Sequence, residues 1–331
     1  MKRIGILILL SLIIVTTLFG AGTQESKKDP LIGVSKFLAH PALDAVEEGM
    51  QDYLKSVGKV VRYDFQNANA DGSATSQIAQ KFKSDKVDIA VGIATPTAQA
   101  LVMTLPTTPV VFSAVTDPIS AGLVTTYSTP YNEQVTGVSD MSPVEAQIAL
   151  LARLSNAKTI GNVYASSEAN GVVLMEEAKE ATEKLGLNFV TAAVANTSEV
   201  KSAMQSIANR VDAVYIATDN TVVSALPSID DVTKRAGIPF MAADPSNVLG
   251  TDFLVAWGFD YYKIGLATGK LVEQILDGKK AGELGTVFLT DPADFELWIN
   301  LDVADKLGIK VADDILESAA VIIKNGQKID Q

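Results

Sequence analysis

The chain has 331 residues, of which 47% are hydrophobic and 20% are charged, and it contains no cysteine. This length suits two compact domains better than one, and the composition is that of a folded protein without a disordered bias. The formal net charge of −12 disfavours nucleic acid as a partner, because a phosphate backbone would repel the surface. The lack of cysteine excludes disulfides, thiolate nucleophiles and cysteine-based zinc sites.

The first residues have the layout of a secretory signal peptide. Lys2 and Arg3 precede an uncharged, mostly apolar run over 4–19, and small residues follow at 20–22. The run is short for a membrane span, which needs about 20 apolar residues, although an uncleaved anchor stays open. Residues 18–21 resemble a lipobox in which Ala21 stands at the position of the lipidated cysteine. We expect a signal peptide at 1–22 and an exported, extracytoplasmic protein without a lipid anchor.

The sequence contains a diverged duplication of about 85 residues per copy. The copies begin at Leu31 and Thr159, and each continues through a short apolar strand into a helix that ends at a glycine, Gly58 or Gly186. A second strand, a second helix and a third strand follow in each copy, and the third strands end in the same Ile-Ala-Thr tripeptide. The expected segments are strands at 60–65 and 188–194, helices at 43–57, 74–83, 172–185 and 198–209, and Asp-Pro pairs at 117–118 and 244–245.

Strands that alternate with helices at this spacing predict parallel sheets with right-handed crossovers, so two copies predict two similar α/β lobes. Ligands of such sheets bind beyond the carboxyl ends of the strands. If the two lobes face each other, the loops at these ends line one shared cleft. The loops lie at 37–41, 95–96 and 116–117 in the first lobe and at 166–170, 218–220 and 244 in the second.

At these loops the sequence resembles the family of ABC-transporter substrate-binding proteins whose known ligands include tryptophan and tyrosine. The resemblance runs from about Ile32 to the C-terminal region and depends on several short segments taken together. These segments are VSKFLAHP at 34–41, IATP at 93–96, VTDP at 115–118, GVSD at 137–140, EAN at 168–170, TDN at 218–220 and GFDYY at 258–262.

The resemblance implies the type I periplasmic-binding-protein fold, in which two Rossmann-like lobes are joined by three crossovers. It places the first lobe at 31–138 plus 259–283 and the second at 139–258 plus 284–331. It implies a solute-binding protein of an ABC importer, with a small ligand and a membrane permease as partners and no cofactor. The implied ligand is tryptophan or tyrosine, while an aliphatic amino acid or another small neutral solute stays open. We expect a monomer.

The candidate ligand-binding residues are those of the strand-end loops. Backbone N–H groups at helix starts favour a carboxylate, and the hydroxyls of Thr95 and Thr218 would add donors. Asp117, Asp219 and Asp244 are candidates to receive an ammonium group, although Thr95 and Asp219 could simply cap helices. The full set is Phe37, His40, Pro41, Ala94, Thr95, Pro96, Thr116, Asp117, Ser166, Glu168, Ala169, Asn170, Thr218, Asp219, Asn220 and Asp244.

Aromatic residues and arginines restrict the ligand further. Phe37 could stack on a flat ligand side chain, whereas His40 is the only histidine and therefore a poor nucleus for a metal site. Trp257 and Phe259 are expected either to pack at the hinge or to line the cleft. An anionic ligand usually recruits arginine, so a zwitterion or a neutral ligand is favoured. The arginines outside the leader all lie away from the strand-end loops, at Arg62, Arg153, Arg210 and Arg235.

Sequence motifs argue against an enzyme. A dinucleotide-binding enzyme needs glycines after its first strand, where this chain has Phe-Leu-Ala-His-Pro at 37–41. Residues 265–271 resemble a P-loop, but they are one residue short and lack Ser or Thr after the lysine, and no G-x-S-x-G elbow occurs. The remaining alternative is a ligand-sensing protein that feeds a receptor. We see no helix-turn-helix before Ile32 and no later membrane span, so such a sensor would need a separate signalling partner.

Overall fold

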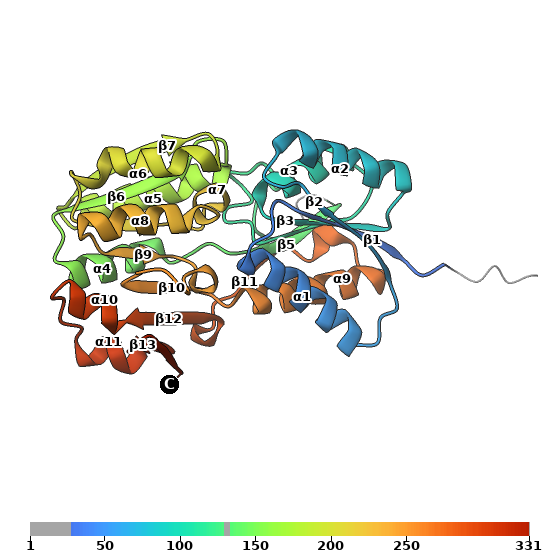
Figure 1. The fold of residues 1–331 in the computed structure, drawn as a ribbon. Helices are drawn as coiled ribbons and strands as arrows, with labels where there is room; N and C mark the ends of the chain where they lie inside the picture. The colour runs from blue at the N-terminus through green and yellow to red at the C-terminus, as the bar shows by residue number, and fades with distance from the viewer. Residues whose placement is uncertain (1–27, 129–132, 331) are drawn as a thin grey trace, which may run out of the picture.

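The structure is a computed structural model that describes residues 28–128 and 133–330. Within these residues the chain forms two α/β lobes and crosses between them three times (Figure 1). The signal peptide that the sequence predicts at 1–22 lies outside the described residues. In the part that the structure describes, no helix combines the length and the apolar character that a membrane span requires.

The first lobe contains a six-stranded sheet in which every described pairing is parallel, in the order β11-β5-β4-β3-β1-β2. Its helices pack against the sheet around one hydrophobic core. The strands are β1 (Leu31–Lys36), β2 (Arg62–Asn67), β3 (Ile89–Ile93), β4 (Val110–Ser113), β5 (Val135–Ser139) and β11 (Thr286–Phe288). The helices are α1 (Pro41–Ser56), α2 (Gly72–Asp85), α3 (Thr95–Thr104), α9 (Tyr261–Leu276) and the 3-10 turn η3 (Ala281–Glu283).

The second lobe contains an eight-stranded mixed sheet in the order β14-β13-β12-β10-β9-β8-β6-β7. Only the β10–β12 and β13–β14 pairs are antiparallel among its described pairings. The strands are β6 (Thr159–Ala165), β7 (Asn188–Val194), β8 (Ala213–Ile216), β9 (Phe240–Ala242), β10 (Val255–Phe259), β12 (Phe295–Asn300), β13 (Val321–Lys324) and β14 (Gln327–Asp330). The helices are α4 (Val144–Ser155), α5 (Ala169–Lys184), α6 (Val200–Ala208), α7 (Asn220–Val223), α8 (Leu226–Ala236), α10 (Leu301–Lys306) and α11 (Asp313–Ser318), with the 3-10 turns η1 (Thr197–Glu199), η2 (Pro245–Asn247) and η4 (Pro292–Asp294).

The strand order confirms the two α/β lobes that the repeat predicts. The order β2-β1-β3-β4-β5 in the first lobe recurs as β7-β6-β8-β9-β10 in the second. The expected helix ends are also observed, because Gly58 and Gly186 have φ angles of 73° and 72°, which favour glycine after a helix. β3 is buried along its whole length and reads as a continuous apolar run, as expected for a parallel strand covered on both faces.

Helices α1 and α9 pack closely, and this packing fixes the position of each helix start, at Pro41 and at Tyr261. A Cβ atom added to Gly49 would lie 2.2 Å from the carbonyl oxygen of Tyr262, so only glycine allows this approach. Gly265 lies against Gly49, and Gly269 lies against Tyr53, so contacts advance in the same direction along both helices. The helices therefore run parallel, and both begin at the side where the strands of the first sheet end.

One segment lies in a different lobe from the one that the sequence suggests. We expected residues 284–331 in the second lobe, but β11 pairs in parallel with β5, with Val287 opposite Val138. Residue 259 also differs, since it ends β10 of the second sheet rather than beginning the return to the first. The parallel pairing with β5 extends the first sheet by one strand, so the third crossing follows β11. The other lobe bounds stay a prediction.

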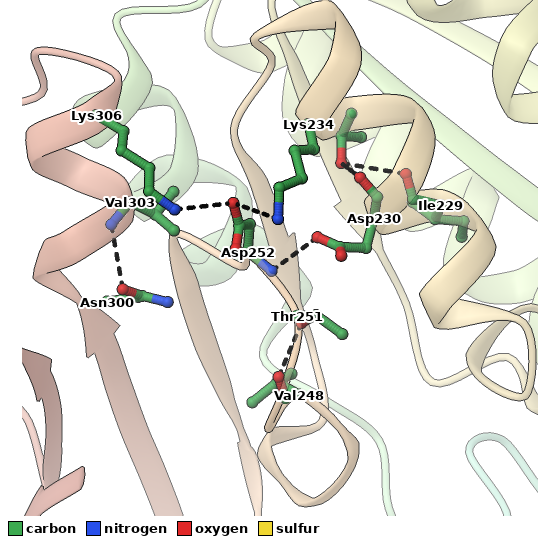
Figure 2. Close-up of polar contacts among 10 residues, drawn as sticks. Ile229, Asp230, Lys234, Val248, Thr251, Asp252, Asn300, Val303 and Lys306 are labelled. Carbon is green, nitrogen blue, oxygen red and sulfur yellow. Dashed lines mark hydrogen bonds and ion pairs between the residues drawn. The ribbon is translucent and has the colours of Figure 1, made fainter. Parts of the chain in front are cut away.

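A polar network ties two helices of the second lobe to the loop that enters β10. Asp252 forms ion pairs with Lys234 and Lys306, both with N–O distances of 3.1 Å (Figure 2). The backbone N–H of Asp252 donates to Asp230 at 2.7 Å. Burial alone would raise the pKa of Asp252, but the ion pairs with Lys234 and Lys306 outweigh burial and hold the pKa below its usual value.

Candidate ligand-binding site

A cavity lies between the lobes, at the carboxyl ends of strands from both sheets. The space open to the centre of a water molecule is about 20 Å³, which is room for roughly one water. A larger solute can therefore enter only if the lobes separate. The cavity is lined by His40, Leu43, Ala114, Thr116, Asp140, Asn170, Thr218, Asp219, Asn220, Val223, Asp244 and Tyr261.

Asp140 and Tyr261 line the cavity at two of the chain crossings. Asp140 follows β5, and Tyr261 opens α9. The hydroxyl of Tyr261 donates to Asp140 at 2.9 Å, and the hydroxyl of Thr116 donates to the other carboxylate oxygen at 3.2 Å. Asp140 is 4% exposed. Burial raises its pKa to about 6, even though these two hydrogen bonds act in the opposite direction. An ionised Asp140 is therefore costly unless a cation lies beside it.

Asp219 provides a second buried carboxylate from the opposite lobe. It precedes α7, is 1% exposed, and accepts hydrogen bonds from the backbone N–H groups of Ala165 at 2.6 Å and Val222 at 3.0 Å. Burial raises its pKa to about 7, and the negative charge of Glu168 adds to this shift. The expectation that Asp219 caps a helix is confirmed, and the same residue also lines the cavity.

Glu168 supports the cavity from behind rather than lining it. Its carboxylate accepts hydrogen bonds from the side chain of Asn220 at 2.6 Å and from the backbone and hydroxyl of Thr221 at 2.9 and 2.7 Å. These contacts connect the start of α5 to the start of α7 and fix the orientation of Asn220. Glu168 therefore positions a lining residue and adds negative charge next to the cavity.

His40 and Asp244 face the cavity from opposite lobes. His40 precedes α1, and Asp244 precedes η2 and accepts a hydrogen bond from the backbone of Ser246 at 2.8 Å. Burial raises the pKa of Asp244, whereas the nearby His40 acts to lower it. Burial also lowers the pKa of His40, although Asp244 favours its charged form. His40 is therefore neutral near pH 7, and the carboxylates of the cavity lack a permanent cationic partner.

Four buried polar atoms of lining residues have no hydrogen-bond partner among the described residues. They are Nδ1 and Nε2 of His40, Oδ1 of Asn170 and Oγ1 of Thr218. His40 lies near Asn220, and Thr218 lies near enough to Tyr261 to lower the pKa of its phenol, but neither contact has regular hydrogen-bond geometry. Since buried polar atoms are normally paired, these atoms indicate a surface that receives a polar solute.

The structure brings together only part of the residue set that the sequence suggests. The suggested residues that line the cavity are His40, Thr116, Asn170, Thr218, Asp219, Asn220 and Asp244. The suggested residues outside the lining are Phe37, Pro41, Ala94, Thr95, Pro96, Asp117, Ser166, Glu168 and Ala169.

Phe37 and Asp117 have other structural roles in the first lobe. Phe37 is 5% exposed and packs in the hydrophobic core, so it does not flank the cavity. Asp117 turns back onto its own loop, where it accepts hydrogen bonds from Tyr127 at 2.7 Å and from the backbone of Ile119 at 3.0 Å. The hydroxyl of Ser120 also donates to it. Both residues lie near strand ends, but neither lines the cavity.

Sequence reasoning missed five lining residues, namely Leu43, Ala114, Asp140, Val223 and Tyr261. Two of them carried a signal, because both belong to family-like segments. Asp140 is the last residue of GVSD, and Tyr261 lies in GFDYY and begins α9. Ala114 has a φ of 52°, a left-handed conformation that non-glycine residues rarely adopt outside functional sites and turns. Nothing in the local sequence pattern predicts this conformation.

Trp257 and Phe259 lie at the hinge rather than in the cavity. The ring of Phe259 packs on that of Phe295, with centroids 4.2 Å apart. Phe259 ends β10, just before the second crossing, and Phe295 begins β12, just after the third, so this contact holds the two crossings together. The carbonyl of Trp257 accepts a hydrogen bond from Gln147 at 2.6 Å, and its side chain lines a groove beside α4. In the described part of the chain, no group of three or more His, Cys, Asp or Glu residues is placed to hold a metal ion.

Comparison with known proteins identifies the family. Residues 31–323 match the family described as ABC transporter substrate binding protein. The chain belongs to this family. It is 33% identical over 291 residues to the tyrosine-binding protein of Clostridioides difficile strain R20291, an alignment that covers 86% of this chain and 83% of that protein. The chain is therefore an ABC transporter substrate-binding protein, a class that binds solutes and is not enzymatic and that implies a transporter as partner.

Two solved structures bear on the arrangement of the lobes. The ABC domain from Streptococcus pneumonia in complex with L-Trp is 34% identical, covers 89% of this chain and 100% of its own, and has a TM-score of 0.84. The ligand-free, open structure of a substrate-binding protein with adhesive properties from Clostridium difficile is 32% identical, with coverages of 89% and 99%, and has a TM-score of 0.66. At nearly equal identity, this ABC transporter substrate-binding protein is closer to the ligand-bound structure.

The closeness to the ligand-bound structure agrees with the contacts between the lobes. Helix α1 of the first lobe touches η2 of the second, and α3 touches α5. The two lobes are therefore in direct contact at two places. Solved structures of lower identity share the same type I periplasmic-binding-protein fold, which confirms the fold class expected from the sequence.

Proposed function

We propose that this ABC transporter substrate-binding protein binds an aromatic amino acid, tyrosine or tryptophan, between its lobes and delivers it to its transporter. The observation that carries the proposal is one cavity, reached from both lobes, that combines buried carboxylates with unpaired polar atoms. A zwitterion has the matching groups, since its ammonium group can donate to carboxylates and its carboxylate can accept from hydroxyl and imidazole groups. The names of the relatives support an aromatic side chain.

Each end of the amino acid has candidate partners in the cavity. Asp140, Asp219 and Asp244 are placed to receive the ammonium group, with Asp140 taking the role that the sequence suggested for Asp117. The hydroxyl of Thr218 and an N–H group of His40 are the side-chain donors left for the carboxylate. The apolar side chain would pack on the remaining lining residues, Leu43, Ala114 and Val223.

Ligand binding would shift the lobes toward the closed form. Asp140 lies at the crossing from the first lobe, whereas Asp219 and Asp244 belong to the second. Closure brings these negative charges together, which opposes closing of the empty cleft. A ligand cation removes this repulsion and contacts both lobes, so it binds the closed form better and shifts the equilibrium toward it.

The location and the other partners complete the proposal. We place the protein outside the cytoplasm as a monomer, after removal of a signal peptide at 1–22, and propose a membrane permease of the ABC type as the partner that receives the amino acid. Mass spectrometry of the exported protein would test the cleavage. A mature chain that begins near Thr23 supports the proposal, and a mature chain that keeps Met1 contradicts it.

Calorimetric titration with L-tyrosine, L-tryptophan, L-phenylalanine and L-leucine tests the ligand. We expect 1:1 binding of tyrosine or tryptophan and weaker binding of leucine. Asp219→Ala and Asp244→Ala should each weaken binding by more than about a hundredfold if the removed carboxylate is the main partner of the amine, because breaking a buried charge pair costs about 3–5 kcal/mol. Asp117→Ala is the matched control and should leave the affinity unchanged. If none of the four amino acids binds, the proposed function is wrong.

A further inference from the structure

We infer that the cleft also takes primary aromatic amines that lack the α-carboxylate, because its lining offers three buried carboxylates to a cationic amine and no lysine or arginine to an acid. This inference rests on the proposed amino-acid site and extends its substrate class.

Acceptors dominate the cavity. Asp140, Asp219 and Asp244 are each at least 95% buried, and no lysine or arginine occurs among the lining residues. Asn170 adds a further acceptor, because its Oδ1 atom has no partner among the described residues and the residue is 4% exposed. An unpaired buried amide oxygen requires a donor from outside the protein. A primary ammonium group supplies three donors and a positive charge, so it suits this lining.

Several donors of the lining residues are already engaged within the protein. The hydroxyls of Thr116 and Tyr261 both donate to Asp140. The side-chain amides of Asn170 and Asn220 donate to the carbonyl of Thr218 and to Glu168. The donor atoms without any partner among the described residues are the hydroxyl of Thr218 and one ring nitrogen of His40, and each amide nitrogen keeps a second N–H group. All of these donors are uncharged.

Of the helix-start residues that the sequence suggested for a carboxylate, several lie outside the lining, whereas Asn170 and Asn220 line it. Thr95 and Pro96 at the start of α3, and Ala169 at the start of α5, do not line the cavity. At the start of α7, the backbone N–H groups of Thr221 and Val222 already donate to Glu168 and Asp219. The α-carboxylate of an amino acid therefore meets only uncharged side-chain donors, next to three buried carboxyl groups.

The charges around the carboxylates favour a cationic ligand over a zwitterion. Burial raises the pKa of Asp140 to about 6 and that of Asp219 to about 7. The titratable groups near them include Glu168, whose negative charge raises the pKa of Asp219, Asp244, whose charge raises the pKa of Asp140, and His40, whose own pKa burial lowers. A bound cation stabilises the ionised carboxylates, whereas the carboxylate of a zwitterion adds another negative charge to the same enclosure.

The experiment compares L-tyrosine with two molecules that each lack one of its charged groups. Tyramine lacks the carboxylate, and hydroxyphenylpropionate lacks the amine. Calorimetric titrations at pH 8 should give a tyramine affinity within about thirtyfold of the tyrosine affinity, a limit that corresponds to about 2 kcal/mol. Tyramine should also compete with tyrosine, and hydroxyphenylpropionate should not bind. Asp244→Asn should weaken tyramine at least as strongly as tyrosine, while Asp117→Asn should change neither affinity.

The outcomes separate this inference from the proposed function. If tyrosine binds and tyramine is more than about thirtyfold weaker, or hydroxyphenylpropionate binds as well as tyrosine, the inference is overturned and the amino-acid site survives. If tyramine binds and competes for the cleft while none of the amino acids binds, the amine class stands and the proposed function is wrong. If no probe binds, both are wrong.

Discussion

Replacement of Asp140 by asparagine should stabilise the unliganded protein and weaken its ligand at the same time. The two side chains have nearly the same shape, and the oxygen of asparagine can still accept a hydrogen bond from Thr116 or Tyr261, while its amide nitrogen can donate to the other hydroxyl. Asp140→Asn therefore removes the buried negative charge and reverses the direction of one of these two hydrogen bonds. The two effects have opposite signs because the charge is costly without a ligand cation and favourable with one.

The magnitude follows from the pKa of Asp140. A folded pKa of about 6 against a usual value of about 3.9 leaves a gap of about two pH units, and each unit corresponds to about 1.4 kcal/mol. Because the folded state binds this proton more tightly than the unfolded state, the stability that Asp140 contributes is present below pH 4 and is lost as the pH rises through 6. Asp140→Asn should therefore raise the free energy of unfolding by up to roughly 3 kcal/mol at pH 8 and change it little at pH 4.

Urea denaturation at pH 8 and pH 4, together with calorimetry of L-tyrosine at pH 8, measures both effects. The affinity of Asp140→Asn for tyrosine should fall by about thirtyfold or more, since removal of one partner of a buried charge pair costs about 2–5 kcal/mol. Asp117→Asn is the control of opposite sign. Burial alone would raise the pKa of Asp117, but hydrogen bonds from Ser120 and Tyr127 outweigh burial and hold the pKa below its usual value. The ionised form of Asp117 therefore stabilises the folded state, so Asp117→Asn should destabilise the protein at pH 8. If Asp140→Asn is no more stable than wild type at pH 8 and binds tyrosine equally well, the charge argument is refuted.

Three further substitutions test the contacts that hold Asp140, Asp219 and Asp252 in place. Tyr261→Phe removes a hydrogen bond to Asp140 and should weaken tyrosine binding by about tenfold. An unchanged affinity for tyrosine would show that this hydrogen bond does not position Asp140. Gly171→Ala places a Cβ atom 2.4 Å from the carboxylate of Asp219 and should lower the melting temperature by several degrees, whereas Gly72→Ala, which meets open space, should not. Asp252→Asn removes the ion pairs with Lys234 and Lys306 and should cost about 1 kcal/mol in low salt and less in high salt; a loss that is independent of salt would contradict this origin.

Much of the fold could be predicted from the sequence because its units are local and repeated. Apolar strand runs, helix-ending glycines and the order of landmarks after Leu31 and Thr159 predict the same five-strand order in both lobes. The placement of β11 could not be predicted in this way. Its three residues carry little periodicity, and their lobe is decided by pairing with β5, which is distant in sequence.

The candidate site was predictable only in part, because strand-end position does not determine where a side chain points. Asp219 and Asp244 face the cavity, whereas Asp117, at an equivalent strand end, is held by its own loop. Asp140 and Tyr261 come together only because the chain crosses between lobes at both residues. Such a contact depends on tertiary packing, so the segments GVSD and GFDYY indicate the family but not that these two side chains meet in the cavity.

A crystal structure of the protein grown with L-tyrosine tests the central claim most directly, namely that an amino acid is held between the lobes by buried carboxylates. We predict ligand density in the cavity between the lobes, with the amine nitrogen about 3 Å from a carboxylate oxygen of Asp140, Asp219 or Asp244. Ligand density outside this cavity, as in the groove beside Trp257, or an amine that faces none of these three carboxylates, would contradict the account.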